Sequence, residues 1–195
     1  MNSPMTEETT RRPPHSLRPE TPAALFVRIP RLPELVKLRP REDEAHLAFL
    51  ARLRFSTTPE EAVTYTAFAA KGPSAAGWGY ECLRLMAGNL QPHEGATMQQ
   101  IAAWLANPTT RLRHQIMKEA LWAPARGPSV LLALAVGWST GTPAPNDPDP
   151  SPTDKTPVAV NSAVLSCLAR VPLSQRPICL ARILDMAETL FGAGP

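Results

Sequence analysis

The sequence predicts an all-α protein. Apolar residues recur at helical spacing from residue 42 to residue 191, and no segment shows the alternation of apolar and polar residues typical of a strand. Prolines also stand where helices begin, at positions 59, 73, 108, 128 and 157. The spacing between these prolines is irregular, so we expect about seven to eight helices arranged in irregular helical hairpins rather than a repeat of one period.

The first 41 residues differ from the rest of the chain. Residues 1–22 carry Pro, Thr, Arg and Glu with almost no large apolar side chain, so we expect a disordered tail. Residues 23–41 form an apolar arm that three prolines interrupt. Phe26 and Ile29 are its candidate contact residues. They either pack against the body of the same chain or belong to a free docking motif for a partner.

We predict that residues 42–191 form a single helical domain. Its most apolar segment, residues 129–139, is predicted to be a central core helix because apolar residues cover nearly every side of it. Residues 142–156 follow as a Pro-rich loop, since proline suits neither a helix interior nor a sheet interior. Loops of this length are functional or disordered.

The junction between this helix and the loop is the first candidate site. Trp138 ends the helix, and we expect its ring to be largely buried. The Ser139 hydroxyl can bond the backbone, and Gly141 can adopt the left-handed conformation that ends a helix. All four tryptophans are interpreted in two ways, as core anchors with a bonded indole N–H or as interface hot spots: Trp78, Trp104, Trp122 and Trp138.

Charge and cysteine content narrow the class of protein. The net charge of +3 comes from the first 42 residues, so the remainder is about neutral and lacks the dense basic face of a nucleic-acid-binding protein. The longest apolar run is too short to span a membrane, and no signal peptide is recognised. We interpret the three cysteines, Cys82, Cys167 and Cys179, as reduced core thiols of a cytoplasmic protein. In the alternative interpretation, one of them is a nucleophile, and the fold brings a general base close to it.

No motif predicts a catalytic residue, a cofactor or a metal. The sequence has no pair of histidines four residues apart and no Gly-rich phosphate loop. Three aspartates of the Pro-rich loop lack the glycine and glutamate that a calcium-binding EF-hand requires. We expect the four histidines to be solvated or to cap helices: His15, His46, His93 and His114.

Four segments resemble motifs of a bacterial family of unknown function. WGYECL at residues 78–83 is similar to the end of an alanine-rich helix with a Trp pair, and WLANPT at 104–109 is similar to a W-[VL]-x-[DN]-P-T junction. LLALAVGWSTG at 131–141 resembles a stretch ending in F-W-S-G-G before a Pro-rich loop. VAVNSAVL at 158–165 resembles an A-V-N-x-A-V-L helix.

The likeness covers roughly residues 44–191. Gly77 stands where the family has the first Trp of its pair, and Thr140 replaces a glycine of its W-S-G-G motif. The resemblance implies an all-helical fold and no particular activity, and it associates the chain with type VI secretion neighbourhoods.

Three functions stay open from the sequence. The first is a non-catalytic helical module that binds another protein. The second is an adaptor, chaperone or immunity-type partner of a secreted type VI effector, and the third is a small helical enzyme with a spatially assembled site. A buried cluster of histidines and carboxylates in a pocket would favour the enzyme, and an exposed apolar patch would favour the binding module.

Overall fold

The computed structural model describes residues 16–192, and every regular element in that range is helical, as predicted. The described chain has ten α-helices and one 3-10 turn, η1 (Ala87–Asn89). The predicted count of seven to eight was low because the arm contributes two short helices, each with a proline in its first turn. The helices are α1 (Pro22–Arg28), α2 (Leu32–Leu35), α3 (His46–Arg54), α4 (Glu60–Ala69), α5 (Gly72–Leu85), α6 (Glu94–Ala106), α7 (Thr110–Trp122), α8 (Pro128–Trp138), α9 (Lys155–Arg170) and α10 (Arg176–Gly192).

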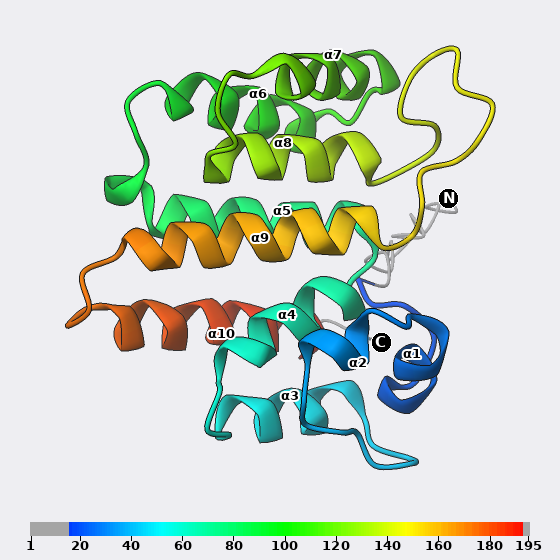
Figure 1. The fold of residues 1–195 in the computed structure, drawn as a ribbon, viewed down its shortest axis with the longest axis vertical. Helices are drawn as coiled ribbons and strands as arrows, with labels where there is room; N and C mark the ends of the chain where they lie inside the picture. Colours follow the sequence, from blue (N-terminus) through cyan, green and yellow to red (C-terminus); the bar gives the residue numbers. More distant parts are fainter. Residues whose placement is uncertain (1–15, 193–195) are drawn as a thin grey trace, which may run out of the picture.

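The helices stack in tiers. Figure 1 shows α6, α7 and α8 above the side-by-side pair α5 and α9, with α4, α10 and α3 below them. Helix α9 joins the tiers, because it packs against α8, α5, α4 and α10. Nine of the eleven residues of α8 are buried, which confirms the prediction of a central core helix at 129–139.

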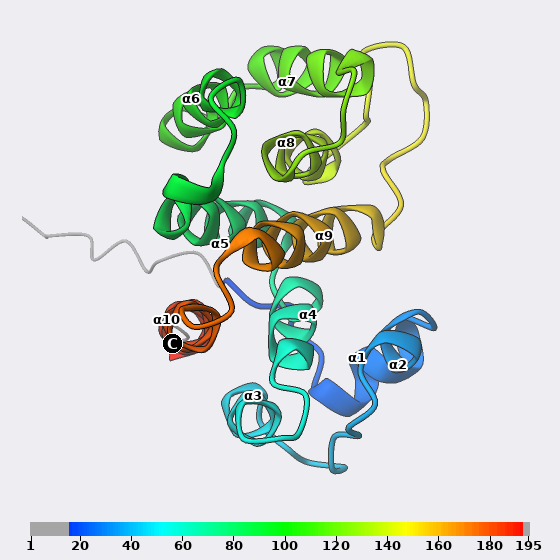
Figure 2. The same cartoon turned by 60° about the vertical axis from the view of Figure 1, so that its left-hand side comes forward.

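The apolar arm packs on its own chain. Figure 2 shows α4 between α10 on one side and α1 with α2 on the other. Phe26 and Ile29 are buried, and the Phe26 ring meets the Phe49 ring edge-on with the centroids 5.7 Å apart. The Glu61 carboxylate accepts hydrogen bonds from the backbone N–H groups of Lys37 (2.9 Å) and Leu38 (3.3 Å). Both candidate residues of the arm are therefore contacts within the chain.

Residues 16–18 join the arm to the junction of α4 and α5. Of the predicted tail, residues 1–22, the part up to His15 lies outside the residues that the structure describes. Leu17 forms an isolated antiparallel bridge with Ala70, while Arg18 N–H donates to the carbonyl of Ala69 at 2.9 Å. The segment from Ser16 onward thus contributes backbone hydrogen bonds to the body of the protein.

A buried carboxylate ties three helices together. Glu94, at the start of α6, accepts hydrogen bonds from the backbone of Gln91 (2.8 Å) and from both the N–H and the hydroxyl of Ser129 in α8 (3.1 and 3.2 Å). Arg170 of α9 pairs with it at 2.6 Å. Burial alone would raise the pKa of Glu94, but the hydrogen bonds from Gln91, Arg170 and Ser129 bring that pKa below its usual value.

His46 is not the solvated or helix-capping residue that the sequence predicted. Its Nδ1 lies 2.6 Å from the Tyr65 hydroxyl, and its Nε2 lies 2.7 Å from the backbone carbonyl of Glu20. Phe191 packs edge-on against both rings, with each centroid distance 6.0 Å. Because a carbonyl oxygen only accepts, neutral His46 donates from Nε2 and accepts the Tyr65 proton at Nδ1. This arrangement attaches the chain before α1 to α3 and α4.

We expect His46 to make stability depend on pH. Burial lowers the pKa of His46 in the folded protein below its ordinary value of about 6.5. The unfolded chain therefore binds a proton first, so this contribution is complete above about pH 6.5 and is lost as the pH falls towards the folded pKa. Urea denaturation from pH 7.5 to 5 should show this slope, and His46→Gln should flatten it. An equal slope in both proteins would contradict the assignment.

Candidate functional site

The Pro-rich loop leaves α8 through a tightly bonded turn. The Ser139 hydroxyl donates to the carbonyl of Val136 at 2.8 Å. Gly141 has a φ of +59°, in the left-handed region predicted for it from the sequence. Beneath the turn the buried Arg113 of α7 donates from Nη1 to the carbonyl of Gly137 at 2.6 Å. A cation at the end of α8 is favourable because the C-terminal carbonyls carry partial negative charge.

The loop closes back on its own base. Ser151 N–H donates to the carbonyl of Gly141 at 3.0 Å, and Arg18 Nη2 donates to the carbonyl of Thr153 at 3.1 Å. The Lys155 ammonium lies 5.2 Å from the ring centroid of Trp138. These contacts bring three distant parts of the chain to one place.

Trp138 lies at the edge of the core: its side chain is partly buried and packs against core residues. Its helix is buried on nearly every side, but Trp138 is the last residue of that helix. Trp138 also lines two hollows, one at the base of the loop and one along α8 and α9.

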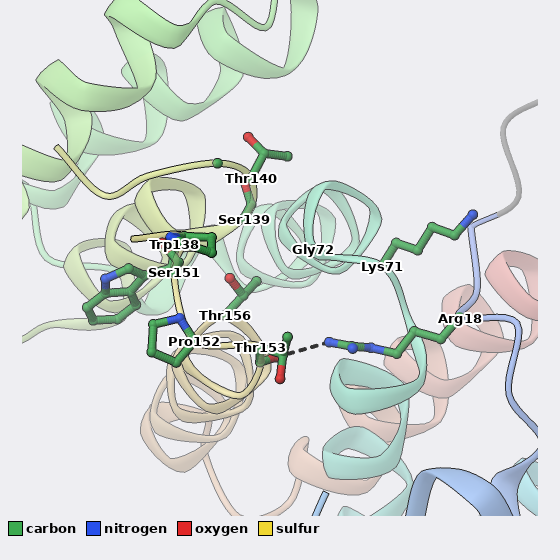
Figure 3. Close-up of a pocket in the computed structure, with 12 residues that line it drawn as sticks. Arg18, Lys71, Gly72, Trp138, Ser139, Thr140, Ser151, Pro152, Thr153 and Thr156 are labelled. Atoms are coloured by element: carbon green, nitrogen blue, oxygen red, sulfur yellow. Dashed lines mark hydrogen bonds between the residues drawn. The ribbon is translucent and has the colours of Figure 1, made fainter. Parts of the chain in front are cut away.

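The hollow at the loop base has a volume of about 250 Å³. It lies between the first turns of α5 and α9 and the two ends of the loop. In Figure 3, Trp138 and Arg18 stand on opposite sides of it, and the Lys71 ammonium points away from it. A Cβ on Gly72, the first residue of α5, would come 2.3 Å from the Ser139 carbonyl oxygen. Glycine at position 72 therefore lets α5 begin directly against the turn.

A second, larger hollow of about 470 Å³ separates α7 from the loop. Met117 and Leu121 of α7 line it together with Pro143 and Pro145 of the loop. Beside them Trp122 is 82% exposed and Leu121 is 49% exposed. Trp122 is thus not a core anchor, although it lies on a helix whose other face is buried.

Trp78 and Trp104 lie in the core. They are 5% and 3% exposed, respectively. Trp78 lines a cleft of about 390 Å³ between α5 and α10, and its indole nitrogen is buried without a hydrogen-bond partner in the described structure. The expected bond to that N–H is therefore not formed.

The titratable groups are dispersed. Within residues 16–192, no group of three or more His, Cys, Asp or Glu is arranged to hold a metal ion. The three thiols are free; Cys82 and Cys167 are buried, and Cys179 is half-buried. Burial raises the pKa of Cys82, and it raises that of Cys167 to about 11, so both are protonated at neutral pH. None of the described helices combines the length and the apolar character that crossing a bilayer demands.

A family model described as "Family of unknown function (DUF6931)" matches residues 49–191. The chain belongs to this family. The DUF6931 match begins within α3 and ends within α10, so α1 and α2 lie before it. The hollow beside α7 lies inside the match, and so does the loop-base hollow except for Arg18. No curated protein gave a significant match, and no solved structure did either. The family named by the comparison is consistent with the resemblance seen in the sequence.

Three candidate residues predicted from the sequence line the loop-base hollow, whereas the exposed residues beside the second hollow were not predicted as a site. Trp138, Ser139 and Gly141 all line the loop-base hollow. Trp122 was considered only as one of four tryptophans, and its neighbour Leu121 was not singled out. A signal was present: Trp122 ends α7 and lies off the face of that helix that carries the buried Ile116 and Ala120.

Proposed function

We propose that the chain is a non-catalytic helical module that binds another protein through the surface formed by α7 and residues 143–145. The observation that carries the proposal is the exposure of Trp122, at 82%, beside an apolar hollow. Large apolar side chains at a protein surface are typical of interaction sites, and tryptophan is enriched among the residues that dominate binding energy.

The shape of this surface suits one anchoring side chain of a partner. Met117 and Leu121 supply apolar lining from α7, and Pro143 and Pro145 supply it from the loop. Prolines restrict the backbone in the free protein, so less conformational entropy is lost when a partner orders the loop. We therefore assign the hollow to a leucine or aromatic side chain of the partner.

The charges beside the hollow define the partner further. Arg111, Gln115, Lys118 and Trp122 follow one another at spacings of three or four residues, so they lie along one stripe of α7. Arg111 and Lys118 are exposed on it. The acidic Glu119 is engaged by Gln100 at 2.6 Å and by Gln115 at 3.0 Å. The expected partner segment carries acidic residues next to its apolar anchor, because such charges would complement this stripe.

The two other functions remain predictions. Partnership with a secreted type VI effector would be one specific form of the proposed binding role. An enzymatic function would need a catalytic group in a hollow, and the buried carboxylate of Glu94 instead holds α6, α8 and α9 together.

We expect Trp122→Ala to abolish partner capture without destabilising the fold. Truncation of an interface hot spot costs at least about 2 kcal/mol of binding energy, or about 30-fold in affinity. An exposed side chain contributes little to folding, so the melting temperature should stay within about 2 °C. The measurement is quantitative affinity purification from the source cells, with melting curves of the same proteins.

Leu173→Ala is the matched control, since Leu173 is 77% exposed in the turn between α9 and α10. It should retain the partners that the unaltered chain captures. Equal recovery of every partner by Trp122→Ala and by the unaltered chain would overturn the proposal.

A further inference from the structure

A histidine that lines the hollow beside α7 faces two groups that it cannot bond at the same time. The Nε2 of His114 lies 3.0 Å from the Nη2 of Arg113 and 3.1 Å from the backbone carbonyl oxygen of Thr142. We propose that His114 is a protonation-dependent latch, which fastens the Pro-rich loop to α7 when its ring is charged and releases the loop when the ring is neutral. The loop forms one wall of this hollow, so the latch regulates the partner-binding surface. That consequence rests on the proposed function, whereas the latch itself lies within this chain.

The two neighbours of this ring nitrogen make opposite demands on it. A guanidinium nitrogen only donates hydrogen bonds, and a carbonyl oxygen only accepts them. An Nε2 without a proton can accept from Arg113, and an Nε2 with a proton can donate to Thr142, but neither form can do both. A hydrogen bond from a charged donor is stronger than one between neutral groups. The neutral ring therefore accepts from Arg113, and the Thr142 carbonyl is left without this donor.

Protonation of the ring transfers the bond from α7 to the loop. An imidazolium carries a proton on both nitrogens, so Nε2 then only donates. Its bond to the Thr142 carbonyl becomes charge-assisted, while the bond to Arg113 is lost and the two like charges repel. Arg113 is held in place, since it is 4% exposed and its Nη1 bonds the Gly137 carbonyl at 2.6 Å. The charged ring therefore turns towards the loop.

This contact matters because the loop has few other polar attachments. Between Thr142 and Pro150, all other hydrogen bonds of the described structure stay within the loop. Figure 1 shows the loop, in yellow, passing one end of α7 on its way from α8 to α9. The bond at His114 therefore decides how firmly residues 143–145, which line the hollow, are held beside α7.

The charged groups of the surrounding elements decide how readily the ring takes a proton. Three cations of α7 lie within about one turn of His114 and oppose its protonation: Arg111, Arg113 and Lys118. Helix α8, which packs against α7, carries no ionisable side chain. The acids of the remaining elements are Glu119 of α7 and Glu94 of α6, which are bonded elsewhere, and two loop residues whose negative charge favours protonation: Asp147 and Asp149.

NMR of the full-length protein, labelled with ¹³C and ¹⁵N, tests the latch in the absence of any partner. Histidine side chains change charge mostly between about pH 5 and pH 8, so spectra are recorded across this range. At the alkaline end we expect the Nε2 of His114 to carry no proton. On acidification, the ring nitrogens, the Thr142 carbonyl carbon and the Ala144 amide should shift with one common midpoint, and the order parameter of the Ala144 amide should rise.

Two matched variants assign these shifts to one histidine. His114→Gln removes the titrating ring and should abolish the pH dependence of the Thr142 and Ala144 signals. His93→Gln removes the same ring from an exposed position before α6 and should leave that dependence unchanged. The proposal is overturned by a neutral His114 with its proton on Nε2, by a Thr142 signal that does not follow the ring, or by the same pH dependence in His114→Gln.

The consequence for the partner is measured separately, by affinity purification at about pH 6 and pH 7.5. A wall that is already fixed loses less entropy on binding, so the unaltered chain should capture more partner at the lower pH, by about fivefold for one charged hydrogen bond. His114→Gln should capture equally at both pH values. Equal capture by the unaltered chain would overturn the regulation of this surface by His114. If Trp122→Ala retains every partner while the NMR signals behave as expected, the proposed binding surface is wrong and the latch is supported.

Discussion

Replacing Glu94 by alanine is expected to lower the free energy of unfolding by about 3 kcal/mol or more. The carboxylate is 1% exposed and accepts four hydrogen bonds, so its loss leaves the Arg170 guanidinium and the Ser129 N–H without their acceptor. Removing one member of a buried pair costs about 3–5 kcal/mol. Arg170 is one-third exposed, which places the expected value at the lower end. Urea denaturation at pH 7 measures it.

Two further variants check the origin of this effect. Arg170→Ala should cost less than Glu94→Ala, because the carboxylate keeps its bonds from Gln91 and Ser129. Glu81→Ala, which breaks the exposed pair with Arg84 within α5, should leave the free energy of unfolding nearly unchanged. A Glu94→Ala protein as stable as Glu81→Ala would show that the carboxylate does not hold the three helices together.

Trp104→Ala should be similarly damaging, with an expected loss of about 3–5 kcal/mol. The Trp104 ring is 3% exposed in the core beneath α6, and truncation leaves a cavity that packed helices cannot fully close. A domain of this size is stable by about 5–15 kcal/mol, so the variant should melt far below the unaltered protein. Calorimetry or urea denaturation measures the difference.

Trp122→Ala provides the comparison for Trp104→Ala. It makes the same change in the neighbouring helix, at a side chain that is 82% exposed, and should leave stability nearly unchanged. Were Trp104→Ala to cost less than about 1 kcal/mol, the ring would not be a core anchor. If the protein with Trp104→Ala is insoluble, Trp104→Phe should fold with an intermediate stability.

Local signals in the sequence predicted the helices well. Pro128 and the apolar run after it predicted α8, and Gly141 predicted the left-handed turn that follows, because each depends on residues close together in the chain. The short helices α1 and α2 were not predicted, because a proline inside an apolar segment usually interrupts a helix. In the structure, Pro22 and Pro33 instead stand in the first turns of these helices.

Contacts between side chains that are far apart in the sequence leave no local pattern by which they could be predicted. Glu94 forms hydrogen bonds with Ser129 and Arg170, which are 35 and 76 residues away in the sequence. No spacing of residue types in the sequence predicts these bonds. His46 bonds Tyr65 and Glu20 for a similar reason: three separate segments meet only after the helices pack.

Whether a tryptophan is exposed also depends on contacts between residues that are far apart in the sequence. Trp104 and Trp122 both lie on amphipathic helices, but the packing of the surrounding helices buries one ring and exposes the other. The hollow at the loop base likewise combines Arg18 with residues 138–156, which only the folded chain brings together.

Site-specific photo-crosslinking at position 122 tests the proposed binding surface most directly. A photoreactive amino acid replaces Trp122 in one protein and the exposed Leu173 in another, and both are irradiated in the source cells. We expect a discrete product with a different polypeptide from position 122 and none from position 173. Equal products from both positions, no product from position 122, or a product consisting only of two copies of this chain would contradict it.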